Sequence, residues 1–232
     1  MTARSIETGA PSLLELVQGL LERTYRMRTG VEDLARFVIG DSGYRVLYGD
    51  PQAGAFAAAA DGSGARTLVR ETSQGVRACV YYPDGLIRTL ERYPPQRGLG
   101  DENVDSFADL VEELDHLLVV AERSREGRET TLFELELHAN VSKHLVLSRF
   151  LAGRHRRLAE SRRRWLRHHL FEKIRYCDAD PAVRARYRDA ARFAVRMIDR
   201  IGRLRPAERL RALRRFHRAP SQEKVRLIRS LG

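Results

Sequence analysis

The sequence contains no run of about 18 apolar residues and only two cysteines. A helix needs a run of about that length to cross a bilayer, so we expect no membrane-spanning helix and no membrane partner. Residues 1–27 lack a basic start followed by an apolar block, which argues against a secretory signal peptide. Cys79 and Cys177 lie far apart in segments of different kinds. We therefore expect no disulfide framework and a reducing, cytoplasmic environment.

Lysine is also scarce, because all but three of the 42 basic residues are arginine. Residues 149–232 hold 26 Arg and Lys against 8 Asp and Glu, a net charge of +18, whereas residues 1–148 carry −7. We therefore divide the chain into an acidic domain, 1–148, and a basic helical region, 149–232. Such asymmetry favours an anionic partner for the basic region, either nucleic acid or an acidic protein. Arginine also covers helix surfaces without binding anything, so part of the excess needs no partner.

Motifs for several common chemistries are absent from the sequence. The glycine-rich stretches GDSG and DGSG lack the lysine and the spacing of a phosphate-binding loop. No serine-centred nucleophile elbow and no Cys–His pairing stands out. These absences leave acidic residues and histidines as the candidates for a site.

Hydrophobic spacing predicts helices over residues 12–27 and 31–41. Segments rich in β-branched and aromatic residues follow and predict a small antiparallel sheet with strands at 44–50, 65–72 and 76–84. The remainder is predicted to be helical, with helices over 84–93, 106–125, 131–152, 154–176, 181–203, 206–217 and 220–231. The predicted fold class is therefore α+β, with a mainly helical body.

The predicted helix 106–125 carries titratable residues beside its apolar stripe. Glu112 and His116 are four residues apart and share one face of the helix, with Glu113 between them. This spacing allows two side chains to bind one metal ion while the intervening glutamate reaches a bound water. The carboxylates of Glu112, Glu113 and Asp115 lie within one turn and repel unless a cation neutralises them, which favours a metal.

Residues 40–148 resemble the ImmA/IrrE-like branch of the zinc peptidases. That family reads His-Glu-Leu-x-His-Leu-Leu, followed by a helix with Glu-Ala-Asn. This sequence reads EELDHLL from Glu112 and then HAN from His138, so that Glu112 replaces a histidine and His138 replaces a glutamate. The exchange keeps two histidines and one carboxylate, which is a known catalytic zinc set.

The resemblance implies a zincin-like fold and a metal-dependent hydrolase, most plausibly a peptidase or an inactive relative of one. It implies zinc, or another divalent metal, bound by Glu112, His116 and His138. Glu113 would be the general base that takes a proton from the metal-bound water. Two further residues of the second helix, Glu134 and Glu136, would orient the histidine ligands.

Three other interpretations remain open. In the first, these charged residues form the solvated edge of an amphipathic helix, and His138 hydrogen-bonds to a carboxylate. In the second, the protein is not an enzyme and residues 149–232 bind nucleic acid or an acidic protein as a regulatory module. In the third, the basic region docks on the acidic domain and serves folding only.

Overall fold

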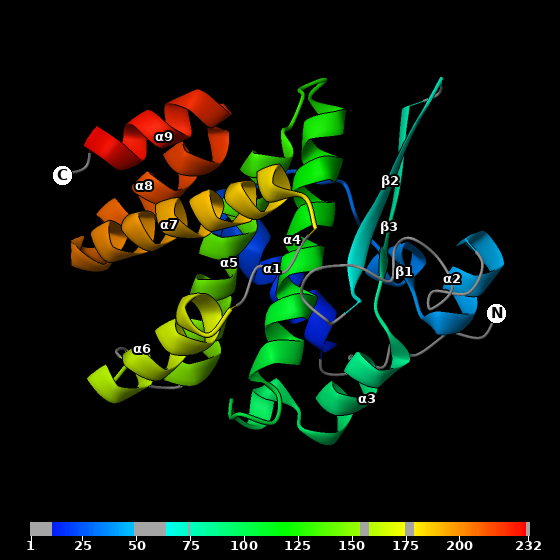
Figure 1. Ribbon diagram of the computed structural model, residues 1–232, viewed down its shortest axis with the longest axis horizontal. Coiled ribbons are helices and arrows are strands. Elements are labelled where there is room, and N and C mark those ends of the chain that lie inside the picture. Colours follow the sequence, from blue (N-terminus) through cyan, green and yellow to red (C-terminus); the bar gives the residue numbers. More distant parts are fainter. Residues whose placement is uncertain (1–10, 49–63, 74, 154–157, 175–178, 231–232) are drawn as a thin grey trace, which may run out of the picture.

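A computed structural model describes residues 11–48, 64–73, 75–153, 158–174 and 179–230. It confirms the α+β fold class, with a small sheet beside a helical body (Figure 1). The helices are α1 (Leu13–Tyr25), α2 (Asp41–Tyr48), α3 (Asp84–Arg92), α4 (Val104–Arg125), α5 (Leu132–Ala152), α6 (Glu160–Arg167), α7 (Pro181–Arg203), α8 (Pro206–Arg218) and α9 (Ser221–Ser230). Helix α4 lies between the sheet and α5, and α7 to α9 lie on the side of the molecule away from the sheet (Figure 1).

The sheet has three strands, β1 (Val38–Ile39), β2 (Arg66–Thr72) and β3 (Gly75–Tyr81), in the order β1-β3-β2. Strands β2 and β3 form the predicted antiparallel hairpin. Strand β1 pairs with β3 in parallel, so the sheet is mixed and the prediction of a purely antiparallel sheet was wrong.

The prediction of a strand over residues 44–50 was also wrong, because residues 44–48 belong to α2. Residues 49 and 50 lie outside the described part of the chain. The central strand, β3, pairs with β1 on one edge and with β2 on the other, and residues 44–48 join neither outer strand. The side chains of Val46, Leu47 and Tyr48 stay exposed on α2, although their types are those of a strand. Strand β1 instead arises inside segment 31–41, where the hydrophobic spacing predicts a helix; only residues 34–37 form a short 3₁₀ turn there.

Short polar and proline signals mark the starts of several helices. Helix α5 begins where the side chain of Thr131 accepts a hydrogen bond from the backbone N–H of Glu134. Helix α7 begins at Pro181, with the carboxylate of Asp180 accepting from the N–H of Ala182. Helix α4 begins two residues earlier than predicted, because Asn103 holds the preceding loop through its side-chain amide rather than capping the helix.

One hydrophobic core joins residues from both sides of position 148. Leu114 and Leu147 belong to the same buried cluster as Leu166, Phe193 and Phe216. None of the helices in the described ranges combines the length and the apolar character needed to cross a bilayer. The basic helical region is thus packed against the acidic domain through a shared interior.

Helix α6 passes directly into a π-helical turn, His168–Glu172. The N–H of Lys173 donates to the carbonyl of His168 over 3.0 Å, which is the i→i+5 bond that defines such a turn. The turn directs His169 toward the start of α4, where its Nε2 lies 3.1 Å from Oδ1 of Asp101. Lys173, just after the turn, pairs with Asp105 over 2.6 Å. These contacts hold basic residues of one region against acidic residues of the other.

Candidate metal centre

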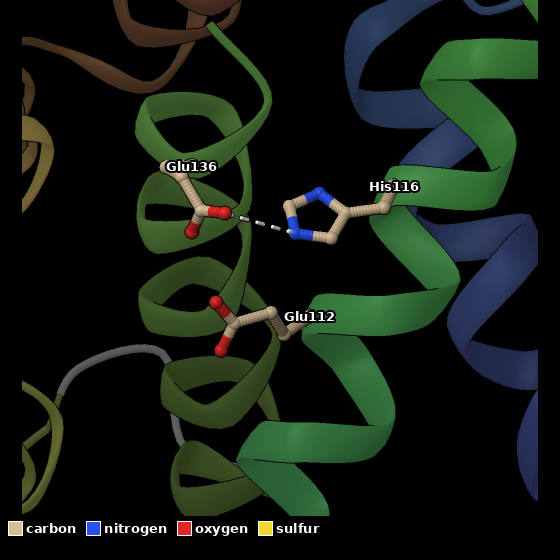
Figure 2. Close-up of side chains that lie close together, drawn as sticks. All are labelled: Glu112, His116 and Glu136. Carbon is tan, nitrogen blue, oxygen red and sulfur yellow. Dashed lines mark ion pairs between the residues drawn. The ribbon is translucent and has the colours of Figure 1, made fainter. Parts of the chain in front are cut away.

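Helices α4 and α5 run antiparallel, and three potential metal ligands meet between them. Glu112 and His116 come from α4 and Glu136 from α5, and one ligand atom of each lies within 4.8 Å of the others. Figure 2 shows the imidazole of His116 reaching toward α5, with the carboxylates of Glu112 and Glu136 turned toward the same space. Nε2 of His116 and Oε1 of Glu136 are 3.8 Å apart. All three side chains are at least four-fifths buried.

Two polar atoms of this group lack a hydrogen bond to any described residue. They are Nδ1 of His116 and Oε2 of Glu136, and both are buried. A buried polar atom without a partner costs roughly 1–3 kcal/mol. A cation bound by the carboxylates and the imidazole would remove part of this cost, so the donor set fits a metal ion.

Lys143 of α5 provides the positive charge closest to the three ligands. Its Nζ lies 2.5 Å from Oε2 of Glu112, and the lysine is buried. Burial alone would lower the pKa of Lys143, but the carboxylate of Glu112 holds it above its usual value. Burial would likewise raise the pKa of Glu112, but Lys143 and His116 hold it below its usual value. Glu112 is therefore ionised and can act as a ligand through its second oxygen.

The other two ligand candidates, Glu136 and His116, both have a pKa above the usual value. Burial raises the pKa of Glu136 to about 7, although the imidazole of His116 opposes the shift. Burial would lower the pKa of His116, but Glu136, Glu113 and Glu112 together hold it above its usual value. Protons and a metal ion therefore compete for the same two side chains near neutral pH.

The structure places His138 away from this group, although the sequence assigned it as a ligand. Residues 136 and 138 are two positions apart on α5 and point to nearly opposite faces, because each residue turns the helix by about 100°. Nδ1 of His138 is 2.8 Å from Oδ2 of Asp115, and its Nε2 is 3.0 Å from Nδ1 of His217. Both ring nitrogens are thus already used in hydrogen bonds.

This contact is part of a buried chain of four residues that links α4, α5 and α8. It continues from His217, whose Nε2 lies 2.5 Å from Oε2 of Glu122. The ring of Tyr25 packs against His138 with centroids 4.4 Å apart. Burial lowers the pKa of His138 to about 4, although Asp115 opposes the shift. His138 is therefore a neutral residue that holds three helices together.

Glu113 and Glu134, the other assigned residues, make their hydrogen bonds outside the group of three ligands, although the charge of Glu113 still acts on His116. The hydroxyl of Thr67 on β2 lies 2.8 Å from Oε2 of Glu113, which ties the expected base to the sheet. Glu134 accepts hydrogen bonds from Arg123, over 3.3 Å, and from the buried ammonium of Lys224. Glu134 therefore balances two cations rather than orienting His116 or His138.

A sequence signal for Glu136 does exist. Glu136, Asn140 and Lys143 recur at intervals of four and three residues, so they form one polar stripe on a helix that is otherwise rich in apolar residues. His138 and Ser142 form a second stripe, four residues apart, that faces α1, where Ser142 lies 3.0 Å from the hydroxyl of Tyr25. Two separate stripes predict two polar interfaces on α5, only one of which faces Glu112 and His116.

Comparison of the chain with known protein families, with curated proteins and with solved structures found no match. The resemblance to the zinc peptidases therefore stays a prediction from a short motif. The geometry between α4 and α5 is the stronger guide to function, because it brings together residues from two separate helices.

Proposed function

We propose that the protein binds one divalent metal ion through Glu112, His116 and Glu136 and uses it for metal-dependent hydrolysis of a peptide bond. The observation that carries the proposal is the meeting of these three side chains at a buried place where two polar atoms lack partners. We also propose a cytoplasmic location, which the free thiol of Cys79 supports.

The chemistry of the three side chains limits the choice of metal. Zinc binds imidazole nitrogen and carboxylate oxygen at about 2.0–2.2 Å, so its ligand atoms must approach within about 3.5 Å of one another. The ligand atoms now lie within 4.8 Å of one another, so binding zinc requires them to approach by about 1 Å. One imidazole and two carboxylates suit manganese as well as zinc. A metal ion held here would lower the pKa of a bound water, and Glu113 is the residue proposed to take its proton.

Metal analysis of protein purified without an affinity tag tests the site. We expect close to one equivalent of a divalent metal in the wild type and its loss in His116→Ala and in Glu136→Gln. His138→Gln is the discriminating variant, because it keeps the metal if Glu136 is the ligand and loses it if the family-like set is correct. Circular dichroism of each variant checks that loss of metal is not loss of the fold.

Two results would contradict the proposal. A folded wild type with far less than one equivalent of metal would contradict the metal site, and so would metal that is retained in both His116→Ala and Glu136→Gln.

Glu113→Gln then separates metal binding from catalysis. A hydrolase keeps its metal and loses activity in this variant, whereas a purely structural site shows no functional change.

The ion pair between Lys143 and Glu112 leads to a second prediction about the same site. We expect Lys143→Met to bind metal at least about tenfold more tightly, because a unit positive charge a few ångströms from the ion opposes it by at least about 1.4 kcal/mol. Competition with a chromophoric chelator measures the affinity. Lys173→Met removes an equal charge from an exposed site near Asp105 and should leave the affinity unchanged. Equal or weaker binding by Lys143→Met would show that the lysine does not oppose the ion.

A further inference from the structure

Four exposed arginines form a patch on α7 and α9. Three of them recur every fourth residue along α7 and share one face of it, and the fourth comes from α9, which packs on α7. The members of this α7–α9 arginine patch are Arg188, Arg192, Arg196 and Arg229. The two helices lie on the side of the molecule away from the sheet (Figure 1).

The guanidinium groups of the patch converge on one aromatic ring. The guanidinium carbons of Arg192, Arg196 and Arg229 lie 5.6, 5.8 and 5.8 Å from the ring centroid of Phe193. Three positive charges around one ring are at most about 12 Å apart, close to the screening length of about 10 Å found at 0.1 M salt, so they repel one another. Their interaction with the ring offsets part of this repulsion.

Acidic residues do not balance the patch. Within the described residues, its only ion pair joins Arg192 to Asp189 over 3.0 Å. Other arginines of the basic helical region do have carboxylate partners, as Arg167 has with Asp199 and Arg215 has with Glu223. Four positive charges against one negative charge leave the patch suited to a polyanion.

The surroundings of the patch favour one kind of polyanion. Among the described residues of α7 and α9, no large apolar side chain is exposed, so the helices have nothing to insert into a lipid surface. Phe193 is 6% exposed and lies beneath the guanidinium groups, so it offers no face on which an unpaired base can stack. The remaining polyanion is a nucleic-acid duplex, whose phosphates are accessible while its bases are stacked inside.

We propose that the α7–α9 arginine patch binds the phosphate backbone of double-stranded nucleic acid without reading its sequence. Binding of this kind releases counterions, so affinity falls steeply as salt rises. None of the three ligands of the metal centre lies on α7 or α9.

Fluorescence anisotropy with a labelled duplex of about 30 base pairs and mixed sequence, read as a function of salt, tests the proposal. The full chain is used as purified. We expect the triple variant Arg192→Gln, Arg196→Gln, Arg229→Gln to bind about 10–100-fold more weakly and to reduce the salt slope by about 2–3. The control Arg163→Gln, Arg164→Gln, Arg211→Gln removes the same charge from exposed positions on α6 and α8 and should change affinity less than about threefold.

Several outcomes would overturn the proposal. Equal weakening in the two triple variants would assign binding to diffuse charge, and absence of duplex binding would remove its basis. Stronger binding to a single strand, or to vesicles of anionic phospholipid, would identify a different ligand. The metal content of every variant is measured in parallel, so failure of this proposal and failure of the metal site are distinguishable.

Discussion

Glu134→Gln is expected to lower the free energy of unfolding by about 3–5 kcal/mol, the range seen when one member of a buried ion pair is removed. Oε1 of Glu134 accepts from both Arg123 and Lys224, and all three residues are at least 95% buried. Glutamine fills the same volume but leaves two buried cations without their shared counter-charge. Urea unfolding followed by circular dichroism measures the loss.

Lys224→Met is the matched control for this prediction. It removes one cation and leaves the pair between Arg123 and Glu134, which lies 3.3 Å apart. Replacing a buried charge with an apolar side chain of similar length is often neutral or stabilising when the remaining charges stay balanced. If Glu134→Gln and Lys224→Met destabilise the protein equally, the loss of stability would come from the hydrogen bond between these two residues and not from unbalanced charge.

The second large effect is a dependence of stability on alkaline pH. Burial lowers the pKa of Lys224 from 10.5 to about 8, although Glu134 opposes the shift. Between these two values the unfolded chain binds more protons than the native protein, so the contribution of Lys224 to stability rises with pH. The rise amounts to about 3 kcal/mol, because each pKa unit corresponds to about 1.4 kcal/mol.

The measurement is the difference in unfolding free energy between the wild type and Lys224→Met, taken at intervals from pH 7 to 10. Subtracting the variant removes the contributions of tyrosines and arginines common to both proteins. The wild type should gain stability relative to the variant as pH rises above 8. A difference that stays flat, or falls, would mean that Glu134 stabilises the ammonium at least as much as burial destabilises it.

Local signals in the sequence predicted the helical body well. Helix α7 has the predicted bounds. Its start is set locally, because Asp180 caps the helix and Pro181 is its first residue. The prediction for segment 44–50 failed for the opposite reason, since whether Val46 and Leu47 join a sheet depends on pairing with residues distant in the sequence. Strand pairing is a long-range property, and β-branched composition alone does not supply it.

The candidate site could likewise be predicted only in part from the sequence. The spacing of Glu112 and His116 is local to one helix and could be predicted, but their partner on α5 depends on how α5 is rotated against α4. Tyr25 of α1 packs on His138 and His217 of α8 hydrogen-bonds to it, and these contacts fix the rotation. Both residues lie about 80 residues or more from His138 in the sequence, so no short motif could include them.

The π-helical turn at His168–Glu172 also constrains the length of the chain. Its i→i+5 bond accommodates about one residue more than a regular α-helical turn. Deleting a single residue here would let α6 continue as an α-helix, but it would rotate His169 away from Asp101 by about 100°. Exposed segments ordinarily tolerate insertions and deletions. This one is expected to tolerate substitutions at its exposed positions yet resist any change in residue number.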